Sequence, residues 1–168
     1  GATTSRHVVG NLEKVFSAAT AFTYPVGDGT NYTPLAVTFS AAVTGNLTAS
    51  VTNTDHPDTT AGTAGIDSSK SINRYWTLKN STISGTYSAA FNYINGTPVD
   101  RDSGATAASF IIRRGTTCSG SGGGRSCVSW GTLTLSGVPS NTLATATGFA
   151  LASGDPEADF ASGEVTST

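Results

Sequence analysis

Apolar and polar residues alternate along most of this chain, which is the pattern of half-buried β-strands. The segment INRYWTLKN, residues 72–80, places Arg74, Trp76 and Leu78 on one face and Tyr75 on the other. Because Trp76 shares its face with aliphatic residues, we interpret that face as core. The arginine stem can then pack near the end of the strand while its head reaches a carboxylate, a carbonyl or an aromatic ring. The opposite face, with Tyr75, is expected to be exposed.

The same alternation recurs in short segments separated by turn residues such as VTGN, TAGIDSSK and YINGTP. The predicted strands are PLAVTFSAA (34–42), NLTASVTN (46–53), GTYSAAFNYI (85–94), ASFIIRR (108–114), SWGTLTLSGV (129–138), ATGFALASG (146–154) and EADFASGEVT (157–166). Helices between the strands are missing, so a βαβ arrangement is not expected. The pattern predicts an all-β fold: an Ig-like or jelly-roll antiparallel β-sandwich with Greek-key connections. Its core should contain Trp76, Phe91, Phe110 and Leu133.

The N-terminal segment differs from the rest of the chain. We divide the chain into an arm, residues 1–20, and one sandwich domain, residues 21–168. Within the arm, NLEKVFSAATAF can form either a short amphipathic helix or an extended strand. Its apolar side chains are those that an assembly arm would insert at a sheet edge of a neighbouring subunit: Val8, Val9, Leu12, Val15 and Phe16.

The composition points away from several classes of partner. Charged residues make up 12% of the chain, against about 25% in an average protein. Ser and Thr supply roughly three residues in ten. The net charge is −2 with no basic stripe, so neither nucleic acid nor an anionic membrane is an expected partner. No apolar run approaches the roughly 18 residues of a membrane span, so membrane insertion is not expected either.

The two cysteines flank a flexible segment. Cys118 and Cys127 enclose mostly Ser and Gly in CSGSGGGRSC. A disulfide would remove much of the entropy of such a loop, so we predict a Cys118–Cys127 bond across a hairpin tip and an oxidising, extracellular compartment. A redox pair would more usually be CxxC, and zinc would need four ligands, while both histidines are distant in sequence.

Enzyme motifs are missing: the chain has no GxSxG, HExxH, phosphate-binding loop or dinucleotide fingerprint. His56 lies between Asp55 and Asp58, which could indicate a metal or acid–base site, but we interpret this segment as a solvated loop. Further acidic groups, Asp100 and Asp102, and Asp155, Glu157 and Asp159, could hold a structural calcium, although neither group has EF-hand spacing. We otherwise expect no cofactor.

A resemblance emerges from the second half of the chain. The strands NRYWTL (73–78) and SFIIRRG (109–115), together with ATGFALA and ADFASGE near the C-terminus, are similar to Ig-like β-sandwich modules of large secreted bacterial surface proteins of the adhesin type. The similarity covers residues 72–164. It implies Arg74, Trp76 and Phe160 as framework residues and an extracellular, non-enzymatic role. The 118–127 loop and NTDHPD (53–58) are not part of that pattern.

Two functions follow as hypotheses. The first is a structural or adhesive subunit on a cell surface or in a filament, which associates with itself or with other surface proteins by strand addition through the arm. The alternative is a carbohydrate-binding module of a secreted protein, in which Trp76, Trp130, Tyr75 and Tyr93 would form a stacking platform. Exposed, coplanar aromatic rings would favour the second hypothesis.

Overall fold

The computed structural model describes residues 6–95, 100–145, 148–151 and 157–166. Strands dominate this part of the chain, which confirms the predicted all-β class and a sandwich of jelly-roll type. The strands are β1 (Val8–Val9), β2 (Leu12–Tyr24), β3 (Val26–Gly27), β4 (Leu35–Thr52), β5 (Ile66–Ser71), β6 (Tyr75–Asn80), β7 (Gly85–Asn92), β8 (Ile111–Thr116), β9 (Ser129–Leu133), β10 (Thr142–Ala144), β11 (Phe149–Leu151) and β12 (Glu157–Val165). Short helical turns are α1 (Pro57–Thr60), η1 (Ala107–Ser109) and η2 (Gly122–Gly124).

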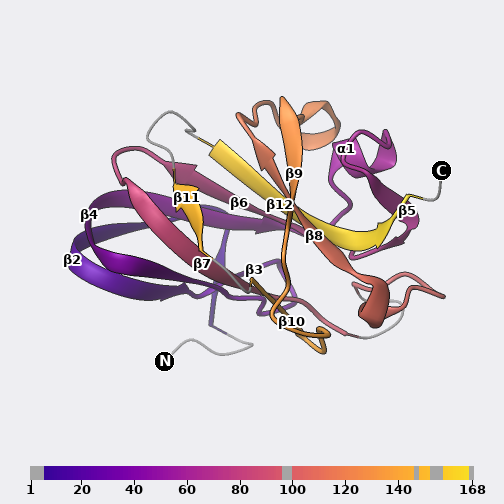
Figure 1. The fold of residues 1–168 in the computed structure, drawn as a ribbon, viewed down its shortest axis with the longest axis horizontal. Coiled ribbons are helices and arrows are strands. Elements are labelled where there is room, and N and C mark those ends of the chain that lie inside the picture. The colour runs from indigo at the N-terminus through magenta and orange to yellow at the C-terminus, as the bar shows by residue number, and fades with distance from the viewer. Residues whose placement is uncertain (1–5, 96–99, 146–147, 152–156, 167–168) are drawn as a thin grey trace.

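One strongly curled antiparallel sheet forms both layers of the sandwich. Its main path runs β10-β7-β4-β6-β12-β8-β9, with β2 added to β4, β5 to β12 and β11 to β7. One edge of β4 pairs with β7 along Leu35–Phe39 and with β6 along Leu47–Thr52. The two ends of β4 therefore belong to different layers. Figure 1 shows β2 and β4 side by side at the left, with α1 and β9 at the upper right.

The bend in β2 and β4 has a local backbone cause. Gly45 has φ +133°, and a Cβ there would lie 2.5 Å from Thr82 Oγ1, so the position requires glycine. Opposite it, β2 carries register shifts between Phe16 and Ala21, and Ala18 has φ 53°. Bulges of this kind increase twist and bend a strand. The predicted strands 34–42 and 46–53 are consequently one continuous strand rather than two strands separated by a VTGN turn.

Aromatic side chains join the layers in the core. Trp76 of β6 packs on Phe91 of β7 with ring centroids 5.2 Å apart, and Phe91 packs on Phe160 of β12 at 4.7 Å. All three side chains are fully buried. Phe110 is also buried, as predicted, whereas Leu133 of β9 is only partly buried because it lies near the sheet margin.

The N-terminal segment is part of the sandwich. From Leu12 to Tyr24 it is a strand that pairs with β4 of the same chain, so the helical alternative is wrong. The domain boundary predicted at residue 20 falls inside this strand. Phe16 is fully buried against Phe39, and Val8 pairs in parallel with Val26.

The other arm residues differ in exposure. Leu12 packs against the core, whereas Val9 and Val15 are 65% and 60% exposed. Within the described residues, no helical segment has the length and hydropathy needed to cross a bilayer.

Candidate functional site

The outer face of β4 and β6 carries a pocket of about 800 Å³. Its floor consists of side chains that lie directly opposite one another across the two strands: Thr48 and Lys79, Ser50 and Thr77, and Thr52 and Tyr75. This is the face of residues 72–80 that was predicted to point away from the core. Strand geometry spaces successive side chains on that face by about 6.8 Å, so the floor is a regular array of polar groups.

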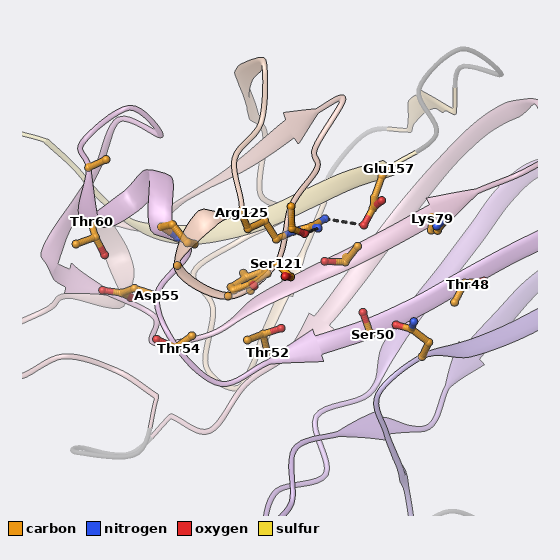
Figure 2. A pocket seen from close by; sticks show the side chains of 18 residues that line it. Thr48, Ser50, Thr52, Thr54, Asp55, Thr60, Lys79, Ser121, Arg125 and Glu157 are labelled. Atoms are coloured by element: carbon orange, nitrogen blue, oxygen red, sulfur yellow. Dashed lines mark hydrogen bonds and ion pairs between the residues drawn. The ribbon is translucent and has the colours of Figure 1, made fainter.

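Two loops rise beside this floor. The β8–β9 hairpin, which carries both cysteines and which we call the disulfide hairpin, contributes residues 120–123. The segment 55–61, which contains α1 and which we call the α1 segment, contributes Asp55, Pro57 and Thr60. Asn11, immediately before β2, also lines the pocket. Figure 2 shows Asp55 and Thr60 at one end, and the Arg125–Glu157 ion pair with nearby Lys79 at the other. The pocket therefore has neighbouring hydroxyls along its floor and charged groups at both ends.

A cluster of buried and partly buried polar side chains supports the pocket, and we call it the Asp159 cluster: His56, Thr77, Arg125, Glu157 and Asp159. Arg125 donates from Nε to Asp159 Oδ2 (2.5 Å) and from Nη2 to both Asp159 Oδ1 (2.8 Å) and Glu157 Oε1 (2.8 Å). Thr77 Oγ1 donates to Asp159 Oδ1 at 2.6 Å. Because Thr77 and Asp159 are register partners on β6 and β12, the sheet itself sets this geometry.

The electrostatics of the Asp159 cluster favour ionised partners. Burial on its own would raise the pKa of Asp159, but hydrogen bonds from His56, Arg125 and Thr77 outweigh it and hold the pKa below its ordinary value. For Arg125, burial acts to lower the pKa, yet hydrogen bonds and attraction from Asp159 and Glu157 raise it. Each charge is thus stabilised by the other, which is the condition for keeping an ion pair out of water.

His56 is buried and structurally engaged, so the interpretation of NTDHPD as a solvated loop is wrong for this residue. Its exposed fraction is 1%. Nδ1 accepts from the Asp58 backbone N–H at 3.1 Å, so Nε2 carries the proton and donates to Asp159 Oδ2 at 2.9 Å. The ring also packs edge-on against Tyr75 and Trp130, with centroids 4.8 and 4.9 Å apart. His56 thereby attaches the α1 segment to β12.

The disulfide hairpin is fastened at the same place. Cys118 and Cys127 are bonded at the tip of the β8–β9 hairpin, which confirms the predicted pairing. Asp58 Oδ2 accepts from the Cys127 backbone N–H (2.9 Å) and from Trp130 Nε1 (2.8 Å). The Cys127 sulfur packs on β8 at Gly115, where a Cβ would lie 2.4 Å from it. Gly115 is therefore required for the hairpin to fold down on the sheet.

A second buried cluster surrounds Arg74, and we call it the Arg74 cluster: Asp28, Thr33, Arg74 and Asp100. Arg74 is 1% exposed and makes a two-point contact with Asp100 through Nε and Nη2, both at 2.9 Å. Nη2 also donates to Asp28 Oδ2 at 2.7 Å, and Nη1 donates to Thr33 Oγ1 at 3.1 Å. The expectation that the arginine head reaches a carboxylate is confirmed.

The acidic groups considered for calcium have other partners. Asp100 binds Arg74, and Asp102 accepts hydrogen bonds from Ser71 and Asn73. Glu157 and Asp159 bind Arg125, while Asp155 lies outside the described residues. These contacts give each described carboxylate of the two groups a structural role within the protein.

The aromatic residues do not form an exposed platform in the described part of the chain. Trp76 and Tyr93 are buried, and Trp130 is half-buried with its indole N–H bound to Asp58. Tyr75 is only 4% exposed, so the expectation that it is exposed is wrong: its ring packs edge-on against His56 and belongs to a buried cluster with Ile66 and Trp130. A ligand in the pocket would meet hydroxyls rather than aromatic faces.

The floor of the pocket offers hydrogen-bonding groups, and its ends carry the charged side chains of Asp55, Lys79 and Glu157. His56 and Asp159 are fully buried at their side chains and bound to each other, so neither offers a free lone pair to the pocket. Within the described part of the chain, the hydroxyls of Thr48, Ser50 and Thr52 have no partner and remain available to a ligand.

Sequence reasoning missed most of this site. The sequence pattern puts Arg125 in a flexible Ser–Gly segment and assigns no role to the outward serine and threonines of β4. The alternation of polar residues at 48, 50 and 52 with apolar residues at 47, 49 and 51 was the signal that marks the outer face. It could not show that two distant loops cover that face.

Searches of known protein families, of curated proteins and of solved structures find no match to this chain. The resemblance to Ig-like surface modules therefore stays a prediction.

Proposed function

We propose that this chain is a non-enzymatic adhesive domain of the cell exterior, and that its outer pocket binds a glycan. The proposal combines the two hypotheses drawn from the sequence, because adhesion requires a recognition site and the pocket supplies one. We infer the class of ligand from the side chains that line the pocket, which are rich in hydroxyl groups and carry equal numbers of positive and negative charges.

One observation carries the proposal: the pocket has a rigid polar floor, and the His56–Asp159 pair beneath it is shielded from a ligand. Thr48 is paired on both edges of β4, with Glu13 of β2 and Lys79 of β6, while Ser50 and Thr52 are held by their register with β6. Preorganised hydrogen-bonding groups lower the entropic cost of binding. General acid–base catalysis instead needs a titratable group within hydrogen-bonding reach of the substrate. His56 and Asp159 are both saturated by their neighbours.

The charges of the lining favour an uncharged ligand. Lys79 and Arg125 contribute two positive charges, while Asp55 and Glu157 contribute two negative charges. A strongly charged ligand would gain little net Coulomb energy and would lose its hydration. A neutral glycan presents hydroxyls that both donate and accept, which matches threonine and serine hydroxyls.

The test is to screen the protein against an array of immobilised glycans and to measure the affinity for any glycan retained by titration calorimetry. Thr52→Val removes one floor hydroxyl at nearly constant shape, and Tyr75→Phe removes another. Each should weaken binding roughly twofold to tenfold, the value of one hydrogen bond. Thr38→Val is the matched control, because Thr38 is an exposed threonine of the same strand outside the pocket.

A retained glycan whose affinity falls equally in the control and in the pocket variants would place binding elsewhere. No retention of any glycan would contradict the proposed ligand class.

A second candidate, assembly through the N-terminal strand, rests on the position of β2. This strand pairs with β4 along one edge, and among the described strands its other edge has no partner. Exchange of β2 between two chains would reproduce the contacts of Phe16 in a dimer or filament. The register shifts in β2 oppose simple addition of another strand to its free edge, so exchange is the route that we propose.

Light scattering on the intact protein over a range of concentrations tests this second candidate. Oligomers that exchange labelled subunits only on slow incubation would support it. A strict monomer at every concentration would contradict it.

A further inference from the structure

We propose that the Cys118–Cys127 disulfide is a redox latch on the outer pocket, and that a dithiol reductant opens the wall formed by residues 120–123. The inference rests on the proposed function insofar as it concerns ligand binding. The opening of the wall itself can be measured without any ligand.

The wall has few attachments apart from the disulfide. Residues 120–123 are Gly-Ser-Gly-Gly, so they contribute almost no side chain to packing. Within the hairpin tip, Ser119 and Ser126 exchange two backbone hydrogen bonds, of 2.9 and 3.0 Å. Glycine has more conformational freedom to lose on ordering than any other residue. The closed wall is thus entropically costly, and the disulfide reduces that cost by limiting the open state.

Arg125 is a further attachment of the wall, beside the backbone hydrogen bonds at Ser119 and Ser126. It donates from Nη1 to the carbonyl of Gly120 at 3.1 Å, while its Nε and Nη2 bind Asp159. The guanidinium therefore connects the wall to β12 directly. On reduction, the covalent link across the tip would be lost, and the glycines would be held only by the Arg125–Gly120 hydrogen bond and the two Ser119–Ser126 backbone bonds.

The sulfur atoms lie where their state affects the Asp159 cluster. Cys127 Sγ is 3.7 Å from Asp159 Oδ2 and 3.9 Å from His56 Nε2. Opening the disulfide would free this sulfur to move away from both groups, and so would change the packing beside the Asp159 cluster.

Thiol–disulfide exchange with a dithiol reductant supplies the two electrons that break the Cys118–Cys127 bond. Cys127 is half-buried, whereas Cys118 is 4% exposed, so the thiolate of the dithiol attacks the Cys127 sulfur. The disulfide bond breaks, and Cys118 leaves as a thiolate that takes up a proton. The second thiol of the reductant then attacks the mixed disulfide and releases Cys127 as a thiol. The protein gains two electrons and two protons, and the reductant becomes a cyclic disulfide.

The experiment compares the oxidised protein with the same protein in dithiothreitol, with full reduction verified by mass spectrometry. Hydrogen exchange at the amides of Ser119 and Ser126 reports on the wall. Exchange there should become roughly tenfold to a hundredfold faster, as the chain-entropy model gives for a loop of about ten residues. If the wall stays closed in about one reduced molecule in ten, and only the closed form binds, the affinity for the retained glycan should fall roughly tenfold.

A Cys118→Ser/Cys127→Ser double variant serves as the matched control. It should behave like the reduced protein and should not respond to dithiothreitol. Unchanged amide exchange in the fully reduced protein would overturn the latch, because the hydrogen bonds of the hairpin tip would then be enough to hold the wall.

Faster exchange with unchanged affinity would overturn the link between wall and pocket while leaving the proposed function intact. If no glycan binds in either state, the proposed function fails and the amide exchange still decides whether the wall opens.

Discussion

Arg74 and Arg125 are both buried and each contacts two carboxylates, yet they lie in different kinds of surroundings. Arg74 is 1% exposed and joins Asp28, Thr33 and Asp100, and none of these four residues lines the outer pocket. Arg125 is 8% exposed, and both it and Glu157 line that pocket. The two clusters have similar internal bonding and different access to a ligand.

The difference shows how the same ionic chemistry can hold a fold in one region and shape a binding surface in another. The Arg74 cluster connects three segments distant in sequence, and its bonds are complete within the protein. The Asp159 cluster connects the α1 segment, β6, β12 and the disulfide hairpin, and so positions the groups that a ligand meets. Four variants and conditions can break or sharpen this contrast.

The largest effect is expected for Arg74→Met. It leaves Asp28 and Asp100 buried without their partner, and breaking such a pair should lower the free energy of unfolding by about 3–5 kcal/mol. Chemical denaturation monitored by tryptophan fluorescence measures this. Glycan affinity per folded molecule should not change. A loss below about 1 kcal/mol, the value of a surface pair, would show that the Arg74 cluster is dispensable.

Arg125→Met should destabilise the protein less but affect the pocket more. The loss of hydrogen bonds to charged partners should cost about 1.5–3 kcal/mol, and amide exchange at Ser119 and Ser126 should accelerate. Lys70→Met is the control, because Lys70 is itself exposed, pairs with Glu164 at 3.7 Å, and its loss should cost about 0–1 kcal/mol. If amide exchange at both serines is unaltered in Arg125→Met, Arg125 does not hold the wall.

Acid should act on the Arg74 cluster through Asp28. Burial tends to raise the pKa of Asp28, but hydrogen bonds from Arg74, Thr30 and Asn31 lower it to about 2. A carboxylate with a depressed pKa in the folded state contributes stability that is complete above its unfolded pKa. That contribution, about 2 kcal/mol, is lost as the pH falls from about 4 to 2.

The free energy of unfolding measured from pH 7 to pH 2 should show this loss for the native protein. Asp28→Asn should be less stable at pH 7 and should have a flatter profile in that window. An equally steep profile in the variant would assign the acid sensitivity to other carboxylates, such as Asp159.

The smallest effect is expected for Asp55→Asn at the far end of the pocket. Burial raises the pKa of Asp55, and repulsion from Asp102 adds to this, while a hydrogen bond from Ser71 opposes it. A raised folded pKa means that stability is lost as the pH rises through that value. The variant should therefore be slightly more stable than the native protein at neutral pH and no more stable in acid. Equal pH profiles would contradict this assignment.

Much of the framework could be predicted because its signals are local. Alternation placed Arg74, Trp76 and Leu78 on the buried face, and the Ser–Gly composition between Cys118 and Cys127 indicated a hairpin disulfide. The pocket could not be predicted in the same way. Ser50, Thr77, Asp159, Gly115 and Trp130 form one row across five strands through successive register pairs. No short segment of sequence contains that row.

The sequence by itself determined most of the strands, their apolar faces and the cysteine pairing, because these depend on side-chain period and loop entropy. The prediction of TAGIDSSK as a turn is wrong, since Ile66–Ser71 forms β5 and pairs with β12. Only the tertiary structure decided that β2 and β4 bend across both layers. It also decided that His56 leaves solvent to bind Asp159, 103 positions away, and that two loops enclose a row of hydroxyls. The reason is physical: burial and ionic pairing depend on which groups the folded chain brings together, and that requires register and loop placement that no local pattern encodes.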